Sequence, residues 1–255
     1  MDLAMLGTLA EGYKNPAQRA RVVTESWGEH NLYCANCNSP KLTRSAQGMQ
    51  VVDYVCPECE SPFQLKSQSK VFSARIIDAG YEPMRRAIVE GRTPNLLALH
   101  YDLVRWQVRN LFLVPRFAFP LSCLEKRKPL GPMARRKGWV GCNILLTSIP
   151  LDARIQLLVE GVQVPASRVR EQYARLRPLE KLKQDARGWT LDVLNVARGI
   201  GRREFMLAEV YVHEAALARL HPYNLHIRDK IRQQLQVLRD LGLVEFLGGG
   251  SYRIL

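Results

Sequence analysis

The chain has 255 residues, of which 47% are hydrophobic and 24% are charged. This is ordinary globular composition, and it excludes a disordered or collagen-like chain. The formal net charge is +13, which predicts a polyanionic partner, with nucleic acid the first candidate. A solvated basic surface without a partner is the alternative. Residues 1–10 lack a basic leader, and no apolar run approaches the ~20 residues of a membrane span, so we expect a cytoplasmic protein that does not engage a membrane.

A first helix is predicted over residues 15–27. Asn15 is a suitable cap for its start, Pro16 suits its first turn, and apolar residues follow at helical spacing. Glu25 lies on this helix. It is either a plain surface acid or a carboxylate that reaches a neighbouring metal site.

The cysteine pattern predicts a zinc site. Four of the six cysteines form two Cys-x-x-Cys pairs, Cys34 with Cys37 and Cys56 with Cys59, separated by 18 residues. Each pair can offer two thiolates from one tight turn, and a tetrahedral zinc ion takes four such ligands. A thioredoxin-like redox motif is the alternative, but two pairs without a βαβ context disfavour it.

Three polar residues flank the second cysteine pair. Residues 49–55 and 61–66 predict two short strands, with Asp53 on the first and Gln64 and Lys66 on one face of the second. Phosphodiester hydrolysis needs a divalent cation held by oxygen ligands and a positive charge beside an activated water. Asp53, Gln64 and Lys66 match that requirement as the pattern D-x10-[EDQ]-x-K, which on its own also arises often by chance.

The middle of the chain predicts the rest of an α/β core. A helix is expected over residues 78–90 and strands over 95–101 and 110–114, which with the preceding elements favours a mixed sheet flanked by helices. Residues 126–187 hold 14 basic and five acidic residues, so most of the net charge lies there. In that stretch a glycine-rich loop carries Arg135, Arg136, Lys137 and Trp139.

That loop could grip phosphates and wedge its tryptophan into a base stack, or Trp139 could pack into the core. Residues 165–187 are expected to form a basic, amphipathic connector. We place the domain boundary within it, giving a first domain over 1–182 and a second domain over 183–255.

The second domain has the pattern of a winged helix. Helices are expected over 190–197, 204–220 and 225–241, followed by strands over 243–247 and 251–255 around a triple-glycine turn. Arginine and glutamine side chains on the third helix are of the kind that contacts guanine and adenine edges. The candidate DNA-binding residues are His226, Arg228, Arg232, Gln233 and Gln236. A winged helix used for protein contacts is the alternative.

Several stretches together resemble the DpnI-type restriction endonucleases: VDYVCPEC, QLKS, ARRKGWVGCNI and the tail that begins HIRDKIRQQLQ. The resemblance implies a PD-(D/E)XK nuclease core with an embedded four-cysteine zinc site and a C-terminal winged helix. It implies cleavage of double-stranded DNA at GATC when the adenine carries an N6-methyl group. The host would be a prokaryote, and we expect a monomer in solution.

The resemblance also implies residue roles. Asp53 would bind Mg²⁺ (or Mn²⁺), Lys66 would activate water, the four cysteines would bind structural zinc, and Trp139 would contact the methylated step. The family has glutamate where this chain has Gln64. Because an amide oxygen can still bind Mg²⁺ but carries no charge, we expect an active enzyme with a raised metal requirement. The alternatives are a non-catalytic zinc-ribbon and winged-helix regulator, and a reader of methylated DNA whose nuclease core Gln64 has inactivated.

Overall fold

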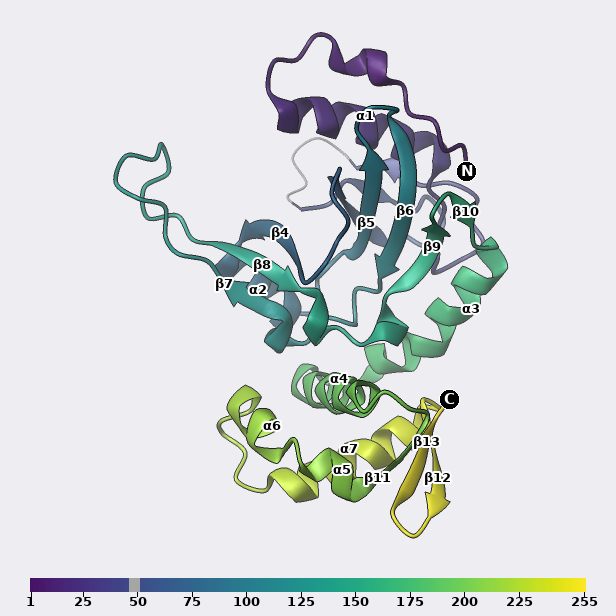
Figure 1. The fold of residues 1–255 in the computed structure, drawn as a ribbon, viewed down its shortest axis with the longest axis vertical. Helices are drawn as coiled ribbons and strands as arrows, with labels where there is room; N and C mark the ends of the chain where they lie inside the picture. The colour runs from purple at the N-terminus through teal and green to yellow at the C-terminus, as the bar shows by residue number, and fades with distance from the viewer. Residues whose placement is uncertain (46–50) are drawn as a thin grey trace. The chain divides into compact units, whose positions relative to one another are not determined.

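The computed structural model describes residues 1–45 and 51–255, which form two compact units (Figure 1). The first unit comprises Met1–Ser73, Pro94–Arg116 and Arg154–Ala174, and the second comprises Ala74–Thr93, Phe117–Ala153 and Arg175–Leu255. Each unit is therefore built from separate stretches of the chain. Within the described residues, no helix has both the length and the hydropathy needed to cross a membrane.

A seven-stranded mixed sheet forms the centre of the first unit. Its spatial order is β1 (Thr43–Arg44), β2 (Tyr54–Val55), β3 (Pro62–Gln68), β5 (Asn95–Asp102), β6 (Gln107–Val114), β9 (Ile155–Val159) and β10 (Val162–Gln163). Among the described strands of this sheet, β3 and β5 form the one parallel pair, and the other neighbours are antiparallel. The buried runs of β5 and β6 place the hydrophobic core at the middle of this sheet.

Helix α1 (Pro16–Asn31) packs against β3. The Asn15 side chain caps it by accepting hydrogen bonds from the next amides, and Pro16 occupies its first position, as the sequence predicts. Helix α3 (Ala166–Leu176) is the other long helix of this unit. It occupies much of the stretch that we expected to be a connector, and the 3₁₀ turn Arg177–Lys181 continues it.

The second unit contains a three-stranded sheet with the order β4 (Arg75–Gly80), β8 (Gly141–Leu145) and β7 (Leu124–Lys126). Helix α2 (Tyr81–Val89) follows β4 directly. The expected helix start at Asp78 is therefore wrong, because residues up to Gly80 pair with β8. The basic loop lies between β7 and β8 and projects from them as a long arm (Figure 1).

The C-terminal part of the second unit is a helix-turn-helix with a wing. It consists of α4 (Gln184–Gly199), α5 (Leu207–Tyr211), α6 (Glu214–Leu220), α7 (Ile227–Asp240) and the hairpin β12 (Val244–Gly248) and β13 (Ser251–Ile254). A third strand, β11 (Glu204–Met206), pairs with β13. The single helix expected over 204–220 is therefore wrong: a strand comes first, and two short helices follow.

Candidate active site and zinc centre

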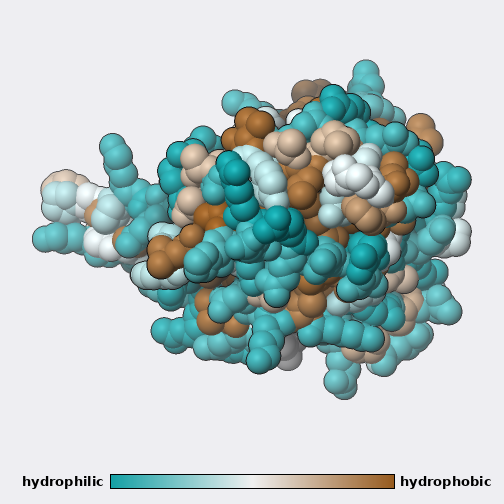
Figure 2. All heavy atoms as spheres, turned by 90° about the horizontal axis from the view of Figure 1, so that it is seen from below, coloured by the Kyte–Doolittle hydropathy of each residue, from teal (hydrophilic) through white to brown (hydrophobic). Residues whose placement is uncertain are grey.

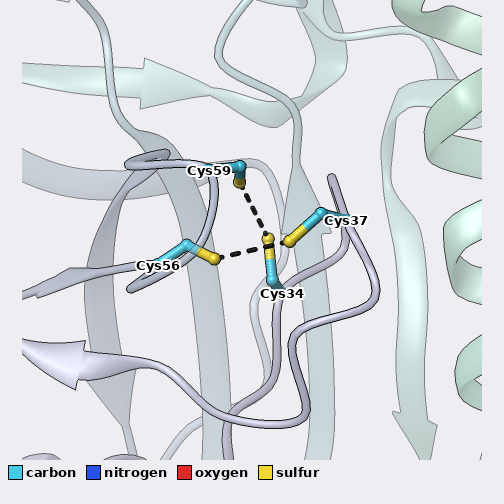
Figure 3. Close-up of side chains that lie close together, drawn as sticks. All are labelled: Cys34, Cys37, Cys56 and Cys59. Carbon is cyan, nitrogen blue, oxygen red and sulfur yellow. Dashed lines mark hydrogen bonds between the residues drawn. The ribbon is translucent and has the colours of Figure 1, made fainter.

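The four predicted cysteines converge in the first unit (Figure 3). Their sulfur atoms all lie within 4.8 Å of one another, with Sγ–Sγ distances of 3.6 Å for Cys34–Cys59 and 3.5 Å for Cys37–Cys56. A zinc–sulfur bond of about 2.3 Å implies sulfur separations of about 3.8 Å in a tetrahedron. The four thiols thus fit a structural zinc ion. Cys123 and Cys142 are buried in the second unit and lie outside this cluster.

Hydrogen bonds around the sulfurs prepare them to act as ligands. The amides of Asn36 and Ser39 donate to the sulfurs of Cys34 and Cys37. Burial raises the pKa of Cys34 and raises that of Cys37 to about 11, whereas at Cys59 hydrogen bonds involving Ser61, Cys56 and Cys37 together outweigh burial and lower the pKa to about 6. The hydrogen bonds from the amides and from Ser61, in contrast to burial, favour the thiolate that zinc requires.

Arg170 of α3 contacts the backbone of the turn that carries Cys34 and Cys37. Its guanidinium donates to the carbonyl oxygens of Cys34 and Ser39, both at 3.1 Å, and lies 5.3 Å from the centre of the Tyr33 ring. These contacts join the first cysteine pair to a helix that begins more than a hundred residues later. Nothing local in the sequence marks Arg170, because its partners lie more than a hundred residues away.

Asp53 lies just before β2 and faces β3. Its amide donates to the Phe63 carbonyl at 2.9 Å, and its Oδ2 accepts a hydrogen bond of 2.7 Å from the Leu65 amide. Because Tyr54 pairs with Phe63, Asp53 lies across from Gln64. Of the strand expected over 49–55, only Tyr54–Val55 is formed among the described residues, and positions 49 and 50 lie outside them.

Gln64 and Lys66 alternate along β3 as predicted. Gln64 is buried and Lys66 is half-buried, and they pair in register with Leu96 and Ala98 of β5. The charge of Lys66 acts on Asp53 by lowering its pKa, which places these two groups in one electrostatic environment. The parallel neighbour strand fixes the backbone that carries both side chains.

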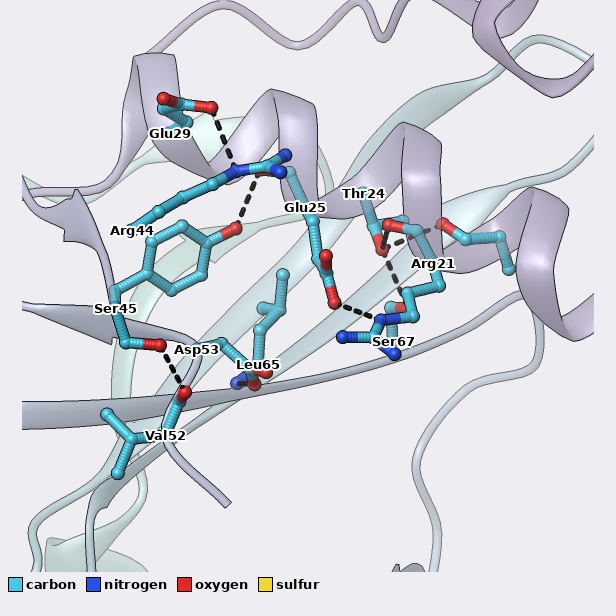
Figure 4. A network of polar contacts seen from close by, with 12 residues as sticks. Arg21, Thr24, Glu25, Glu29, Arg44, Ser45, Val52, Asp53, Leu65 and Ser67 are labelled. Atoms are coloured by element: carbon cyan, nitrogen blue, oxygen red, sulfur yellow. Dashed lines mark hydrogen bonds and ion pairs between the residues drawn. The ribbon is translucent and has the colours of Figure 1, made fainter. Parts of the chain in front are cut away.

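A second carboxylate, Glu25 of α1, also acts on Asp53. Burial is the main cause that raises the pKa of Asp53, the hydrogen bond from Leu65 opposes it, and the charge of Glu25 raises it further. Glu25 forms an ion pair with Arg21, whose positive charge lowers the pKa of Asp53. From the sequence alone Glu25 could be a surface acid or a carboxylate near a metal site, and its i, i+4 spacing from Arg21 is the local signal of this ion pair (Figure 4).

The oxygen atoms at this position suit a hard divalent cation. Asp53 offers a carboxylate and Gln64 an amide oxygen, and both kinds of donor bind Mg²⁺ or Mn²⁺ in proteins. The Asp53 Oδ2 atom is engaged by the Leu65 amide, which orients the carboxylate. Donors of these kinds suit a hard divalent cation.

The predicted DNA-binding residues of the loop lie on the arm between β7 and β8, in the second unit. Arg135 and Arg136 are exposed. Trp139 is half-buried, and the Arg136 guanidinium lies 4.6 Å from the centre of its ring. The tryptophan is thus covered on one face by an arginine, and contact of Trp139 with DNA stays a prediction.

The predicted residues of the third helix lie on the exposed side of α7 or at its start. His226 precedes the helix, and Arg228, Arg232, Gln233 and Gln236 are exposed, while Ile231 and Leu235 are buried. Arg228 and Arg232 form ion pairs with Glu214 and Asp229. Such exposed pairs are weak. A space-filling view likewise shows a face on which hydrophilic side chains predominate over scattered hydrophobic groups (Figure 2).

Two family models match the chain over nearly its whole length. The model of the Dam-replacing family DpnI matches residues 1–182, and the model of the Dam-replacing helix-turn-helix domain matches residues 185–254. The first match covers the zinc centre and Asp53, Gln64 and Lys66, and the second covers the helices and the wing. The chain therefore belongs to the DpnI family of restriction enzymes, with a nuclease-family region followed by a DNA-binding helix-turn-helix domain.

Proposed function

We propose that this protein is a metal-dependent type II restriction endonuclease that hydrolyses double-stranded DNA at GATC sites whose adenine is N6-methylated. The observation that supports it best is the position of Asp53 across from β3, the strand that carries Gln64 and Lys66, in a chain of the DpnI family that also holds a four-cysteine cluster. We assign residues 1–182 to the endonuclease domain and 183–255 to the winged-helix domain, and we propose that the protein is a monomer in solution.

In this proposal the side chains position the metal ion and the attacking water, and they supply charge beside the scissile phosphate. Asp53 and Gln64 would hold the catalytic Mg²⁺ (or Mn²⁺), which would supply a Lewis acid that polarises the scissile phosphate. Lys66 orients the attacking water and takes part in removing its proton. A new phosphorus–oxygen bond forms from the water, and the bond to the departing sugar oxygen breaks. The zinc centre keeps the backbone on both sides of these residues in place.

We assign DNA binding to the arm and to α7. Arg135, Arg136 and Trp139 contact the duplex from the arm, and His226, Arg228, Arg232, Gln233 and Gln236 contact it from the helix-turn-helix. A single methyl group adds about 1–3 kcal/mol of discrimination in an apolar pocket. A palindromic site carries two methyl groups, so sensing both multiplies the preference.

The decisive experiment compares one plasmid prepared with and without adenine methylation at GATC, incubated with the protein in Mg²⁺ and separately in Mn²⁺. We expect cleavage of the methylated plasmid alone. Asp53→Ala should abolish cleavage while DNA binding persists, because the substitution removes the one carboxylate of the proposed trio. Equal cleavage of both plasmids would contradict the proposed specificity.

The second candidate is a methyl-DNA reader without nuclease activity, which the neutral Gln64 side chain favours. It predicts methyl-selective binding in a gel-shift assay and no cleavage in either metal. The same two plasmids therefore separate the candidates.

A further inference from the structure

The arm between β7 and β8 ends at a pair of glycines on neighbouring strands. Gly80, the last residue of β4, lies across from Gly141, the first residue of β8. Both glycines are buried. Because neither has a side chain, a ring can approach the backbone of this strand pair closely. The side chain of Trp139, two residues before Gly141, occupies that position.

The glycines determine how closely the Trp139 ring can lie. A Cβ atom at Gly141 would lie 2.9 Å from Trp139 Cζ3 and 3.0 Å from Trp139 Cη2. Carbon atoms in contact are about 3.5–4.0 Å apart, so a side chain at Gly141 would displace the ring. A Cβ atom at Gly80 would lie 3.6 Å from Trp139 Nε1, which is ordinary contact.

Hydrogen bonds hold the backbone that carries this ring. The Trp139 amide donates to the Arg136 carbonyl oxygen at 3.0 Å, and the Trp139 carbonyl oxygen accepts from the Leu130 amide at 2.9 Å. The Gly138 amide donates to the Leu130 carbonyl oxygen at 3.0 Å. The turn of the arm therefore fixes the Cα atom of Trp139, and the paired glycines set the place of its ring.

Arg136 covers the same ring from the solvent side of the arm. Its side chain is exposed, and its guanidinium lies 4.6 Å from the ring centre. An exposed cation–π contact is weak, whereas arginine forms strong, often bidentate hydrogen bonds with phosphate. A DNA duplex that reaches the arm therefore offers Arg136 a better partner than the ring, and departure of the guanidinium uncovers Trp139.

We propose that Gly80 and Gly141 are positioning residues that seat Trp139 for its contact with DNA, and that Arg136 covers the ring in the free protein and moves to a phosphate when DNA binds. This inference rests on the proposed function, because it concerns the part of the arm in recognising the methylated site. The alternative is that the tryptophan only covers glycines at the end of a strand pair, which is a known way to stabilise a sheet.

The test follows the indole N–H signals of the ¹⁵N-labelled, zinc-loaded, full-length protein by NMR. The chain has four tryptophans, and Trp139→Phe identifies the signal of Trp139. Gly141→Ala should shift that signal and leave the other three in place. The same variant should lower kcat/KM for a duplex with methylated GATC by about 10–100-fold, because a small misplacement of a contacting group is costly.

A rescue by size shows whether the loss acts through the ring. The Trp139 atoms that a Cβ atom at Gly141 would meet belong to the outer six-membered ring, which phenylalanine lacks. The double variant Gly141→Ala/Trp139→Phe should therefore cleave as well as Trp139→Phe alone. Gly80→Ala should shift the Trp139 signal less than Gly141→Ala, because its contact with the ring is longer.

Gly131→Ala is the matched control on the same arm. A Cβ atom at Gly131 would meet nothing within 4 Å, so this variant should keep the wild-type Trp139 signal and the wild-type cleavage rate. Thermal unfolding confirms that each variant is folded.

Arg136→Gln tests the release of the ring. In the free protein this variant should shift the Trp139 signal, because it removes the cation over the ring. With a methylated duplex bound in the absence of Mg²⁺, the wild type and Arg136→Gln should give the same Trp139 signal, because neither then has a guanidinium on the ring. A difference that persists in the complex would refute the release.

The remaining outcomes separate this inference from the proposed function. If Gly141→Ala shifts the Trp139 signal without changing cleavage, the glycines serve only the sheet and the inference is refuted. It is also refuted if Gly141→Ala lowers cleavage equally in the Trp139→Phe background. If the wild type cuts methylated and unmethylated DNA alike, or cuts neither, the proposed function is wrong, whereas the indole signals with and without DNA still decide the seat and the release.

Discussion

Gly28 of α1 allows the helix to approach β2 closely, and replacing it by alanine should destabilise the protein. A Cβ atom at this position would lie 2.9 Å from Tyr54 Cζ, closer still to the Tyr54 hydroxyl, and 3.0 Å from Leu32 Cδ1. Tyr54 cannot yield easily, because it is fully buried and its hydroxyl donates to the Glu25 carbonyl oxygen. The new methyl group therefore meets a fixed ring.

The size of the effect follows from three contributions. Alanine in place of glycine favours a helix by about 1 kcal/mol. Overpacking costs about 1–3 kcal/mol, and disturbing the Tyr54 hydrogen bond costs about 0.5–1.5 kcal/mol. The net loss centres on about 2 kcal/mol, and for a chain of this size each kcal/mol moves Tm by about 2–4 °C. We expect Tm to fall by about 4–8 °C.

Gly188→Ala provides the matched control. Gly188 lies inside α4, and a Cβ atom there would meet nothing within 4 Å. This variant should gain up to about 1 kcal/mol and raise Tm. Both variants are measured by differential scanning calorimetry with zinc bound. A Tm for Gly28→Ala at or above the wild-type value would refute the argument that Tyr54 is immovable.

Three further predictions concern Asp53, Arg170 and the arm. Because burial raises the pKa of Asp53 from 3.8, the folded state binds its proton more tightly than the unfolded chain, and ionisation costs stability as the pH rises through the raised value. Asp53→Asn should therefore raise Tm at pH 7, and thermal scans should show the gain shrinking as the pH falls toward 4; a constant gain would contradict this origin. Arg170→Met should release zinc about tenfold faster to a chromogenic chelator, whereas the exposed Arg168→Met should not. Replacing Arg135 and Arg136 by alanine should lower the salt dependence of DNA binding by about 0.9 log units for each phosphate that the variant no longer neutralises; an unchanged slope would exclude the arm from the interface.

Strand β3 was predictable because its signals are local. The alternation of Gln64 and Lys66 on it follows from the two-residue period. The cysteine spacing likewise predicts the cluster that the structure forms. The capped start of α1 at Asn15 is visible in the sequence for the same reason.

The errors occur where a distant partner decides the structure. Glu204–Met206 becomes a strand because it pairs with Arg253, Tyr252 and Ser251 at the other end of the domain, and Phe205 stacks on Tyr252 at a centroid distance of 5.7 Å. The end of β4 is formed by pairing with β8, more than sixty residues later. No local periodicity reports such pairings.

The sequence also did not predict which stretches of the chain form each structural unit. The stretch that connects β3 to its parallel neighbour β5 belongs to the second unit, so the first unit closes only after the chain has left it and returned. The two family models meet near residue 182, whereas the two structural units are each made of several separate stretches of the chain. The domain boundary at residue 183 therefore stays a prediction.

The position of Arg170 sets an order of events during synthesis. The last zinc-binding cysteine leaves the ribosome about 110 residues before Arg170, and at about 5–20 residues per second this interval lasts roughly 5–20 seconds. During that time the knuckle can take up its ion without the arginine that later bonds to the carbonyl oxygens of Cys34 and Ser39. We expect the arrival of α3 to slow the release of a bound zinc ion, so zinc taken up during translation would be held more firmly once Arg170 is in place.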